Sequence, residues 1–208
     1  MKSQLTEEAG TSKPVATFKR LYELWPGNNR FLLNGRVLLG PRADLVWVLG
    51  TWTVLFLAQV AFSVFVGPYL WTKVSIWLPL LSWLFFICTV LFLLLTSLTD
   101  PGILPRKTIC DLIVGIGAKV QGEATYCKEC EIYRPKSAKH CFRCNNCVLE
   151  LDHHCPFLGS CIGKNNYQHF IAALIAVGLL GLTNVSCMCI YVISDWSSGI
   201  RPKRVRKS

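Results

Sequence analysis

The sequence predicts an α-helical integral membrane protein with three transmembrane helices and a zinc-stapled, cysteine-rich domain between the second and third helices. Two features predict this class: three long apolar runs without charge, and a cluster of cysteines and histidines in the longest polar segment. Hydrophobic residues make up 52% of the 208 residues and charged residues only 16%, below the share of about 25% typical of soluble domains. A soluble globular fold is therefore disfavoured.

The three apolar runs cover residues 45–66, 74–95 and 170–193, and none contains a charged residue. Each exceeds the roughly 20 residues that cross a bilayer core as a helix. A helix buried in a globular core is the alternative for any single run, but three such runs in one short chain oppose it. The first run begins too deep in the chain to be a cleavable signal peptide. We expect GPYLWTK, residues 67–73, to form a short turn between the first two spans.

Basic residues are distributed unevenly around the spans. Seven precede the first span, Lys73 alone lies between the first and second, and nine lie between the second and third. Basic residues concentrate in cytoplasmic loops. The N-terminal arm, residues 1–44, and the long segment 96–169 are therefore predicted to be cytosolic, in an endomembrane (Golgi or ER) or the plasma membrane. Seven acidic residues in the long segment leave no concentrated basic patch, so no nucleic-acid partner is predicted.

Two regions outside the spans carry predicted local structure, and one does not. In the arm, RFLLNGRVLLG, residues 30–40, is expected to form a short strand or hairpin at the membrane face. In the long segment, small β-hairpins and loops are expected over a core of residues 125–167. The basic tail, residues 194–208, directly follows the third span. A missing fourth span, a fragment or an alternative ending would each produce such a tail.

Seven of the eleven cysteines and all four histidines fall between Cys127 and His169. A cytosolic location disfavours disulfides, whereas paired Cys-x2-Cys turns grip tetrahedral zinc, and a structural site closes with four ligands. Two zinc ions need eight ligands. Seven are supplied by Cys127, Cys130, His140, Cys141, Cys144, Cys147 and Cys161. The eighth must come from His153, His154 or Cys155.

Alternation of side chains along an extended backbone separates these three candidates. His154 can turn toward zinc, which leaves His153 and Cys155 together on the opposite face. A histidine beside a cysteine is the basic unit of thiol nucleophilic catalysis. Asp152 could orient His153 as the third member of a triad, although strict alternation puts it on the other side, so the contact needs a local bend. The alternative is that Cys155 is a redundant residue of the zinc sites.

The motif Asp152 to Cys155, within C-x2-C-x9-HC-x2-C-x2-C-x4-DHHC-x5-C, resembles the zinc-finger DHHC family of protein S-acyltransferases (palmitoyltransferases). DPG at residues 100–102 and NNY-x2-F at residues 165–170 strengthen the resemblance. It implies transfer of palmitoyl or similar long acyl chains from acyl-CoA to cysteine thiols of cytosolic or membrane proteins. The resemblance places the acyl-enzyme on Cys155, with His153 as base and Asp152 as its orienter.

The resemblance also implies two structural zinc ions. One would be held by Cys127, Cys130, His140 and Cys147, and the other by Cys141, Cys144, His154 and Cys161. The acyl chain could be lined by Trp47, Trp52, Phe56, Trp83 and Phe170, and the CoA phosphates could pair with Arg106, Lys107, Lys136, Lys139 and Lys164. A fourth helix of the family is absent from these 208 residues. The alternative function is therefore a truncated, catalytically weak isoform or a membrane-anchored zinc module that binds partners without acyl transfer.

Overall fold

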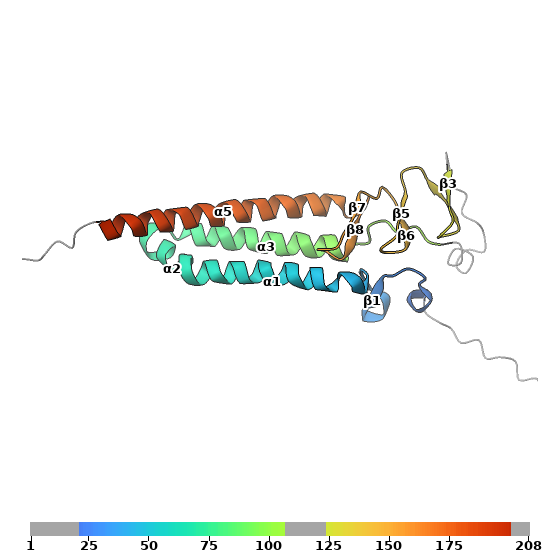
Figure 1. The fold of residues 1–208 in the computed structure, drawn as a ribbon, viewed down its shortest axis with the longest axis horizontal. Helices are drawn as coiled ribbons and strands as arrows, with labels where there is room; N and C mark the ends of the chain where they lie inside the picture. Colours follow the sequence, from blue (N-terminus) through green and yellow to red (C-terminus); the bar gives the residue numbers. More distant parts are fainter. Residues whose placement is uncertain (1–20, 107–123, 201–208) are drawn as a thin grey trace, which may run out of the picture.

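The computed structural model describes residues 21–106 and 124–200. Outside these residues lie 1–20 of the predicted arm, 107–123 within the predicted loop, which include Lys107, and 201–208 of the predicted tail. Three long helices run side by side, and a set of short strands sits at one end of them (Figure 1). In chain order the strands of the cysteine-rich segment follow the second long helix and precede the third.

Three helical segments are long and apolar enough to cross a membrane: Arg42–Val74, Trp77–Leu98 and Tyr167–Ser194. The first begins as α1 (Leu45–Ala61) and continues through a π-helical turn, Phe62–Val66, a short α2 (Gly67–Tyr69) and a second π-helical turn, Leu70–Val74. The second is α3 (Trp77–Leu98), and the third begins α5 (Tyr167–Ile200). Apolar side chains cover the outward faces of all three helices, as a lipid environment requires.

The expected turn over residues 67–73 is wrong, because these residues are helical. Pro68 lacks the backbone N–H that an α-helix would use. The flanking π-helical turns accommodate it by shifting the hydrogen-bond register, so that the Gly67 N–H bonds to the Phe62 carbonyl. The chain turns only at Ser75, which adopts an extended backbone with φ −165° and ψ 134°.

A buried polar cluster joins all three helices. Ser82 of α3 donates to Asn184 of α5 over 2.6 Å, and Gln59 of α1 donates to Ser82 over 3.1 Å. The Asn184 side chain also donates to Gln59 over 3.3 Å. Such bonds stabilise helix association in lipid, where unpaired polar groups are costly.

The strands form four separate antiparallel hairpins. In the arm, β1 (Arg30–Leu32) pairs with β2 (Val37–Leu39), so the predicted hairpin is confirmed. In the cysteine-rich segment, the pairs are β3 (Ala124–Cys127) with β4 (Ile132–Pro135), β5 (Lys139–Cys141) with β6 (Asn146–Val148), and β7 (His153–Cys155) with β8 (Ser160–Ile162).

Two side chains and one close backbone contact attach these hairpins to the helices and the arm. The Asp100 carboxylate accepts from the N–H groups of Gly102 and Ile103, both over 2.9 Å, where the chain leaves α3. Asn166 donates to the carbonyls of Thr96 and Cys161. At Gly40 an added Cβ would lie 1.7 Å from the Gly159 carbonyl, so the arm lies directly on the β7–β8 turn.

Candidate metal centres and active site

Two hairpins bring together the first group of metal-type donors. Ligand atoms of Cys127, Cys130, His140 and Cys147 all lie within 4.8 Å of one another. Nδ1 of His140 lies 3.6, 3.4 and 3.8 Å from the three sulfurs. Tetrahedral zinc with Zn–S near 2.3 Å and Zn–N near 2.0 Å requires N···S separations of about 3.5 Å. This donor set therefore fits one zinc ion.

The second group has the same composition and lies closer to the helices. Cys141, Cys144, His154 and Cys161 also place their ligand atoms within 4.8 Å of one another. Nδ1 of His154 lies 3.7, 3.3 and 3.5 Å from the three sulfurs, again matching tetrahedral zinc. All three cysteines are buried. The two Cys₃His clusters contain the same eight residues that the resemblance implies.

The imidazole environments of the two clusters differ. Burial and the nearby Arg106 guanidinium lower the pKa of His140, which favours the neutral ring that ligates metal. Burial also lowers the pKa of His154, but hydrogen bonds to the Cys141 and Cys144 sulfurs and to Asp44 outweigh it and raise the pKa to about 10. Negative partners therefore stabilise positive charge at His154, and a zinc ion would supply that charge in place of the proton.

Cys155 belongs to neither cluster, although it follows His154 directly. Cys155 is only 9% exposed and packs with Leu93 of α3, Ile162 of β8 and Ala173 of α5. Because side chains alternate along β7, His154 points to the second cluster while His153 and Cys155 share the other face. One thiol is thus left among apolar side chains at the end of the helices.

His153 contacts Asp152 in the structure. His153 Nδ1 and Asp152 Oδ2 lie 2.8 Å apart, with the two side chains 42% and 55% exposed. Asp152 lies just before β7, so its side chain need not follow the alternation of side chains along that strand. The expected bend therefore falls at the start of β7. When Nδ1–H donates to the carboxylate, Nε2 is left as the proton acceptor. The His153 ring also stacks edgewise on Phe170, with 5.3 Å between centroids, and Phe170 packs against the apolar cluster around Cys155.

Residues 120–206 match the family model described as DHHC palmitoyltransferase. The chain carries a DHHC palmitoyltransferase domain. It is 34% identical over 184 residues to palmitoyltransferase ZDHHC18-A of Danio rerio, covering 78% of this chain and 39% of that relative. Human ZDHHC18 is 33% identical over 82% of this chain and 49% of its own length, and human ZDHHC14 is 30% identical over 83% and 40%. The chain thus spans half or less of the length of these relatives.

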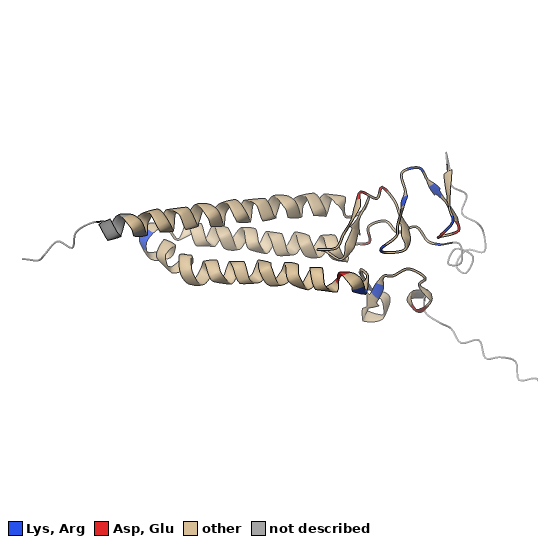
Figure 2. Cartoon of the chain, viewed as in Figure 1, with Lys and Arg blue, Asp and Glu red and all other residues tan. Residues whose placement is uncertain are grey.

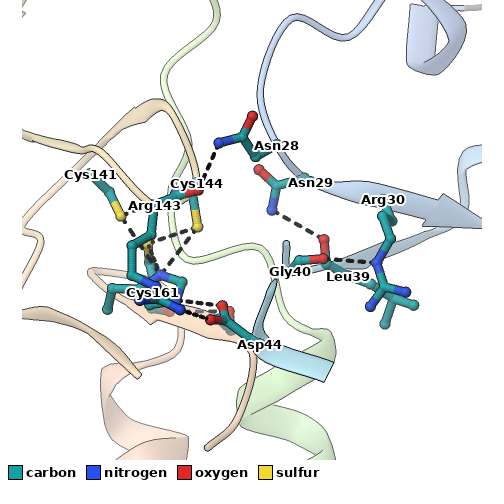
Figure 3. Close-up of polar contacts among 12 residues, drawn as sticks. Asn28, Asn29, Arg30, Leu39, Gly40, Asp44, Cys141, Arg143, Cys144 and Cys161 are labelled. Carbon is teal, nitrogen blue, oxygen red and sulfur yellow. Dashed lines mark hydrogen bonds and ion pairs between the residues drawn. The ribbon is translucent and has the colours of Figure 1, made fainter. Parts of the chain in front are cut away.

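Asp44 belongs to the site, although the sequence patterns did not predict a role for it. Its carboxylate is 1% exposed, lies 2.7 Å from Nε2 of His154 and forms an ion pair with Arg143 (Figure 3). A carboxylate behind a metal-binding histidine fixes the ring tautomer and raises its basicity. No local signal identifies this role, because Asp44 is 110 residues from His154 in the sequence. In the sequence, Asp44 is simply an acidic residue that precedes the first apolar run.

The aromatic residues expected along an acyl chain separate into two groups. Trp52 and Phe170 pack against the cluster around Cys155. The remaining three are not among the residues that pack directly against it: Trp47 contacts Phe157, Trp83 contacts Phe86, and Phe56 contacts both Phe86 and Trp52.

Two of the basic residues expected near CoA phosphates line one cavity of about 510 Å³. Lys139 and Lys164 share it with the carboxylates of Asp152 and Glu150, and Lys164 forms an ion pair with Glu150 over 3.1 Å. The cavity therefore opens beside the His153–Asp152 pair. Arg106 instead donates to the Asn145 carbonyl.

Proposed function

We propose that this DHHC protein is a membrane-embedded protein S-acyltransferase that forms an acyl-enzyme on Cys155. The observation that carries the proposal is the isolation of one thiol: eight neighbouring donors form two closed groups, and Cys155 is outside both. The names of the relatives, all palmitoyltransferases, support the same activity. Palmitoyl or a similar long acyl chain is the proposed group transferred.

The first step uses the His153–Asp152 pair as its base. Nε2 of His153 takes the proton from the Cys155 thiol while Asp152 holds Nδ1. The thiolate then attacks the thioester carbonyl of acyl-CoA, a new C–S bond forms, and the C–S bond to CoA breaks. The protonated His153 returns its proton to the departing CoA thiolate. In the second step the thiolate of a substrate protein displaces Cys155 in the same way.

The surroundings of Cys155 suit a substrate with an apolar and an anionic end. The fatty chain would enter the apolar side of the cluster, where Trp52, Leu93 and Ala173 come from three different helices. Each buried CH₂ contributes about 0.8 kcal/mol. The CoA phosphates would lie in the cavity that Lys139 and Lys164 line, on the side of Asp152.

Zinc has a structural role in this proposal. The two Cys₃His groups would each hold one ion, and closed four-ligand sites of this kind stabilise folding. The strands of the hairpins that carry them are only three or four residues long. Their own apolar contacts are few, so metal ligation would hold β7 and thereby the positions of His153 and Cys155.

We further propose that the strand-bearing end faces the cytosol. Figure 2 shows helices without charge along most of their length, with Lys and Arg gathered in the arm and the hairpins. Within the described residues, Lys73 is the basic side chain at the opposite end. This asymmetry supports a cytosolic arm (1–44), a cytosolic DHHC domain (96–169, core 125–167) and a bilayer between them and Lys73.

The test is incorporation of an alkyne-tagged palmitoyl group from its CoA ester into the purified chain. Wild type is expected to acquire a hydroxylamine-sensitive label, and Cys155→Ser to lose it. Cys189→Ser is the matched control, because Cys189 is an exposed thiol in the second half of α5, whose first residue, Tyr167, follows the hairpins, and it should label like wild type. Label that persists in Cys155→Ser, or never appears in a wild-type chain that holds two zinc ions, would defeat the proposal. Transfer to an added cysteine peptide then tests the second step.

A further inference from the structure

A second polar cavity lies on the arm side of the DHHC domain. It has a volume of about 560 Å³ and lies between the arm, the start of the first span and the β5–β6 turn. Its lining residues are Asn28, Arg30, Pro41, Arg42, Ala43, Phe142 and Arg143. None of these residues lines the cavity beside Asp152, so the two sites are distinct.

The lining is strongly basic. It contains three arginines and, among the described residues, no carboxylate. The nearby Asp44 is buried, and both its oxygens are engaged, one by His154 and the other by Arg143. It therefore offsets the charge of at most one guanidinium. Three guanidinium groups around one cavity match the charge and the planar, bidentate geometry with which arginine binds phosphate.

The site is partly preorganised. Nε of Arg30 donates to the Gly40 carbonyl over 3.0 Å, which leaves its terminal nitrogens for a ligand. Asn28 donates to the Arg143 carbonyl over 2.9 Å and so holds the arm against the β5–β6 turn. Figure 3 shows Arg143 extending from that turn toward Asp44, and Arg30 on the arm opposite.

The position of the cavity favours a lipid over a soluble anion. Arg42 is the first residue of the first membrane-spanning segment, so the cavity lies at the depth of lipid headgroups. Apolar side chains are exposed on the same parts of the chain: Phe142 in the cavity lining is 81% exposed, and Leu33, at the tip of the hairpin that begins at Arg30, is 71% exposed. Basic residues interleaved with exposed apolar ones are typical of surfaces that bind anionic membranes.

We propose that this cavity binds the phosphate headgroup of an anionic phospholipid. The ligand would contact Arg30 and Arg42 from the arm side and Arg143 from the DHHC domain, and would hold the two together. The site does not depend on acyl transfer, because Cys155 and His153 take no part in it.

The experiment measures binding of dioctanoyl phosphatidic acid to the purified full chain in a neutral detergent. Dioctanoylglycerol, inorganic phosphate and a phosphoserine peptide serve as comparison ligands. One basic residue near a membrane contributes about fivefold to binding. Arg42→Gln should therefore weaken binding about fivefold, and Arg30→Gln combined with Arg42→Gln about thirtyfold. Lys73→Gln, at the opposite end of the helices, is the matched control and should bind like wild type. Arg143 is left intact, because its loss would leave the buried Asp44 without one of its partners.

Zinc content and the thermal midpoint without lipid must equal those of wild type for each variant to be compared. Tighter binding of the phosphatidic acid than of the other three ligands, lost in the arginine variants only, supports the proposal. Equal binding of dioctanoylglycerol, or equal effects of Arg42→Gln and Lys73→Gln, would overturn it. Equal affinity for inorganic phosphate would assign the cavity to a soluble anion, and tighter binding of the phosphopeptide would assign it to a protein partner. Either result also refutes the lipid assignment.

Discussion

Replacing Asp44 by asparagine should weaken one zinc site and leave the other unchanged. The carboxylate lies 2.7 Å from Nε2 of His154, and both side chains are buried. Asparagine keeps the size and one oxygen acceptor but removes the charge that also pairs with Arg143. The substitution therefore tests the electrostatic part of the contact with little change in packing.

The expected magnitude follows from the position of Asp44 behind a ligand. Loss of a hydrogen-bond partner to a metal-binding histidine lowers metal affinity about 10–100-fold, which corresponds to about 1.4–2.7 kcal/mol at that site. Among the described residues, the side-chain partners of Asp44 are His154 and Arg143, and neither is a ligand of the other cluster. One of two zinc ions should therefore leave more readily.

The assay is timed removal of zinc by a colorimetric chelator from purified protein, with total zinc measured before and after. Wild type should release two slow equivalents, and Asp44→Asn one slow and one at least about tenfold faster. Glu129→Gln is the matched control, because Glu129 is exposed near the other cluster and should leave both rates unchanged. Simultaneous acceleration of both equivalents in Asp44→Asn, or acceleration of neither, would refute the separate role of Asp44 at one site.

Three further predictions test the domain and the base. Cys141→Ser removes a ligand of the second cluster, so it should lower zinc content and abolish cooperative thermal unfolding of the domain; retention of two ions would contradict the ligand set. His153→Gln should slow acyl-enzyme formation about 10²–10⁴-fold with zinc content unchanged, and a wild-type single-turnover rate would exclude it as the base. Gly40→Ala forces a Cβ to 1.7 Å from the Gly159 carbonyl. It should expose the arm to trypsin at Arg36, whereas Gly50→Ala, with open space around it, should not.

Much of the architecture could be predicted because it depends on local sequence patterns. Uncharged runs longer than a bilayer core specify the spans regardless of their neighbours, and the arm hairpin follows from turn chemistry at Asn34 and Gly35 between apolar residues. The turn predicted at residues 67–73 is wrong, although Gly67 and Pro68 lie there. Neighbouring π-helical turns instead shift the hydrogen bonds and carry the helix on to Val74.

The candidate site divides in the same way. Cys-x2-Cys spacing brings two thiols to one metal from a single turn, so counting ligands left two of His153, His154 and Cys155 without metal. Alternation along an extended strand then favoured His154 as the ligand and Cys155 as the spare thiol. Strand alternation could not predict on which side the Asp152 side chain lies, because that depends on where β7 begins. The strand begins at His153, one residue after Asp152. The contact between its carboxylate and His153 follows from that boundary.

By itself, the sequence determined three apolar helices long enough to span a membrane and the spacing of the metal-type donors around Cys155, since each depends on residues close together in the chain. Only the tertiary structure decided that Asp44 supports His154, that apolar residues of α1, α3 and α5 surround Cys155, and that three arginines meet between the arm and the DHHC domain. These contacts join residues from different elements, and the Asp44–His154 contact joins residues 110 positions apart. No local periodicity encodes them, because they form only when the arm and the hairpins meet at one end of the helices.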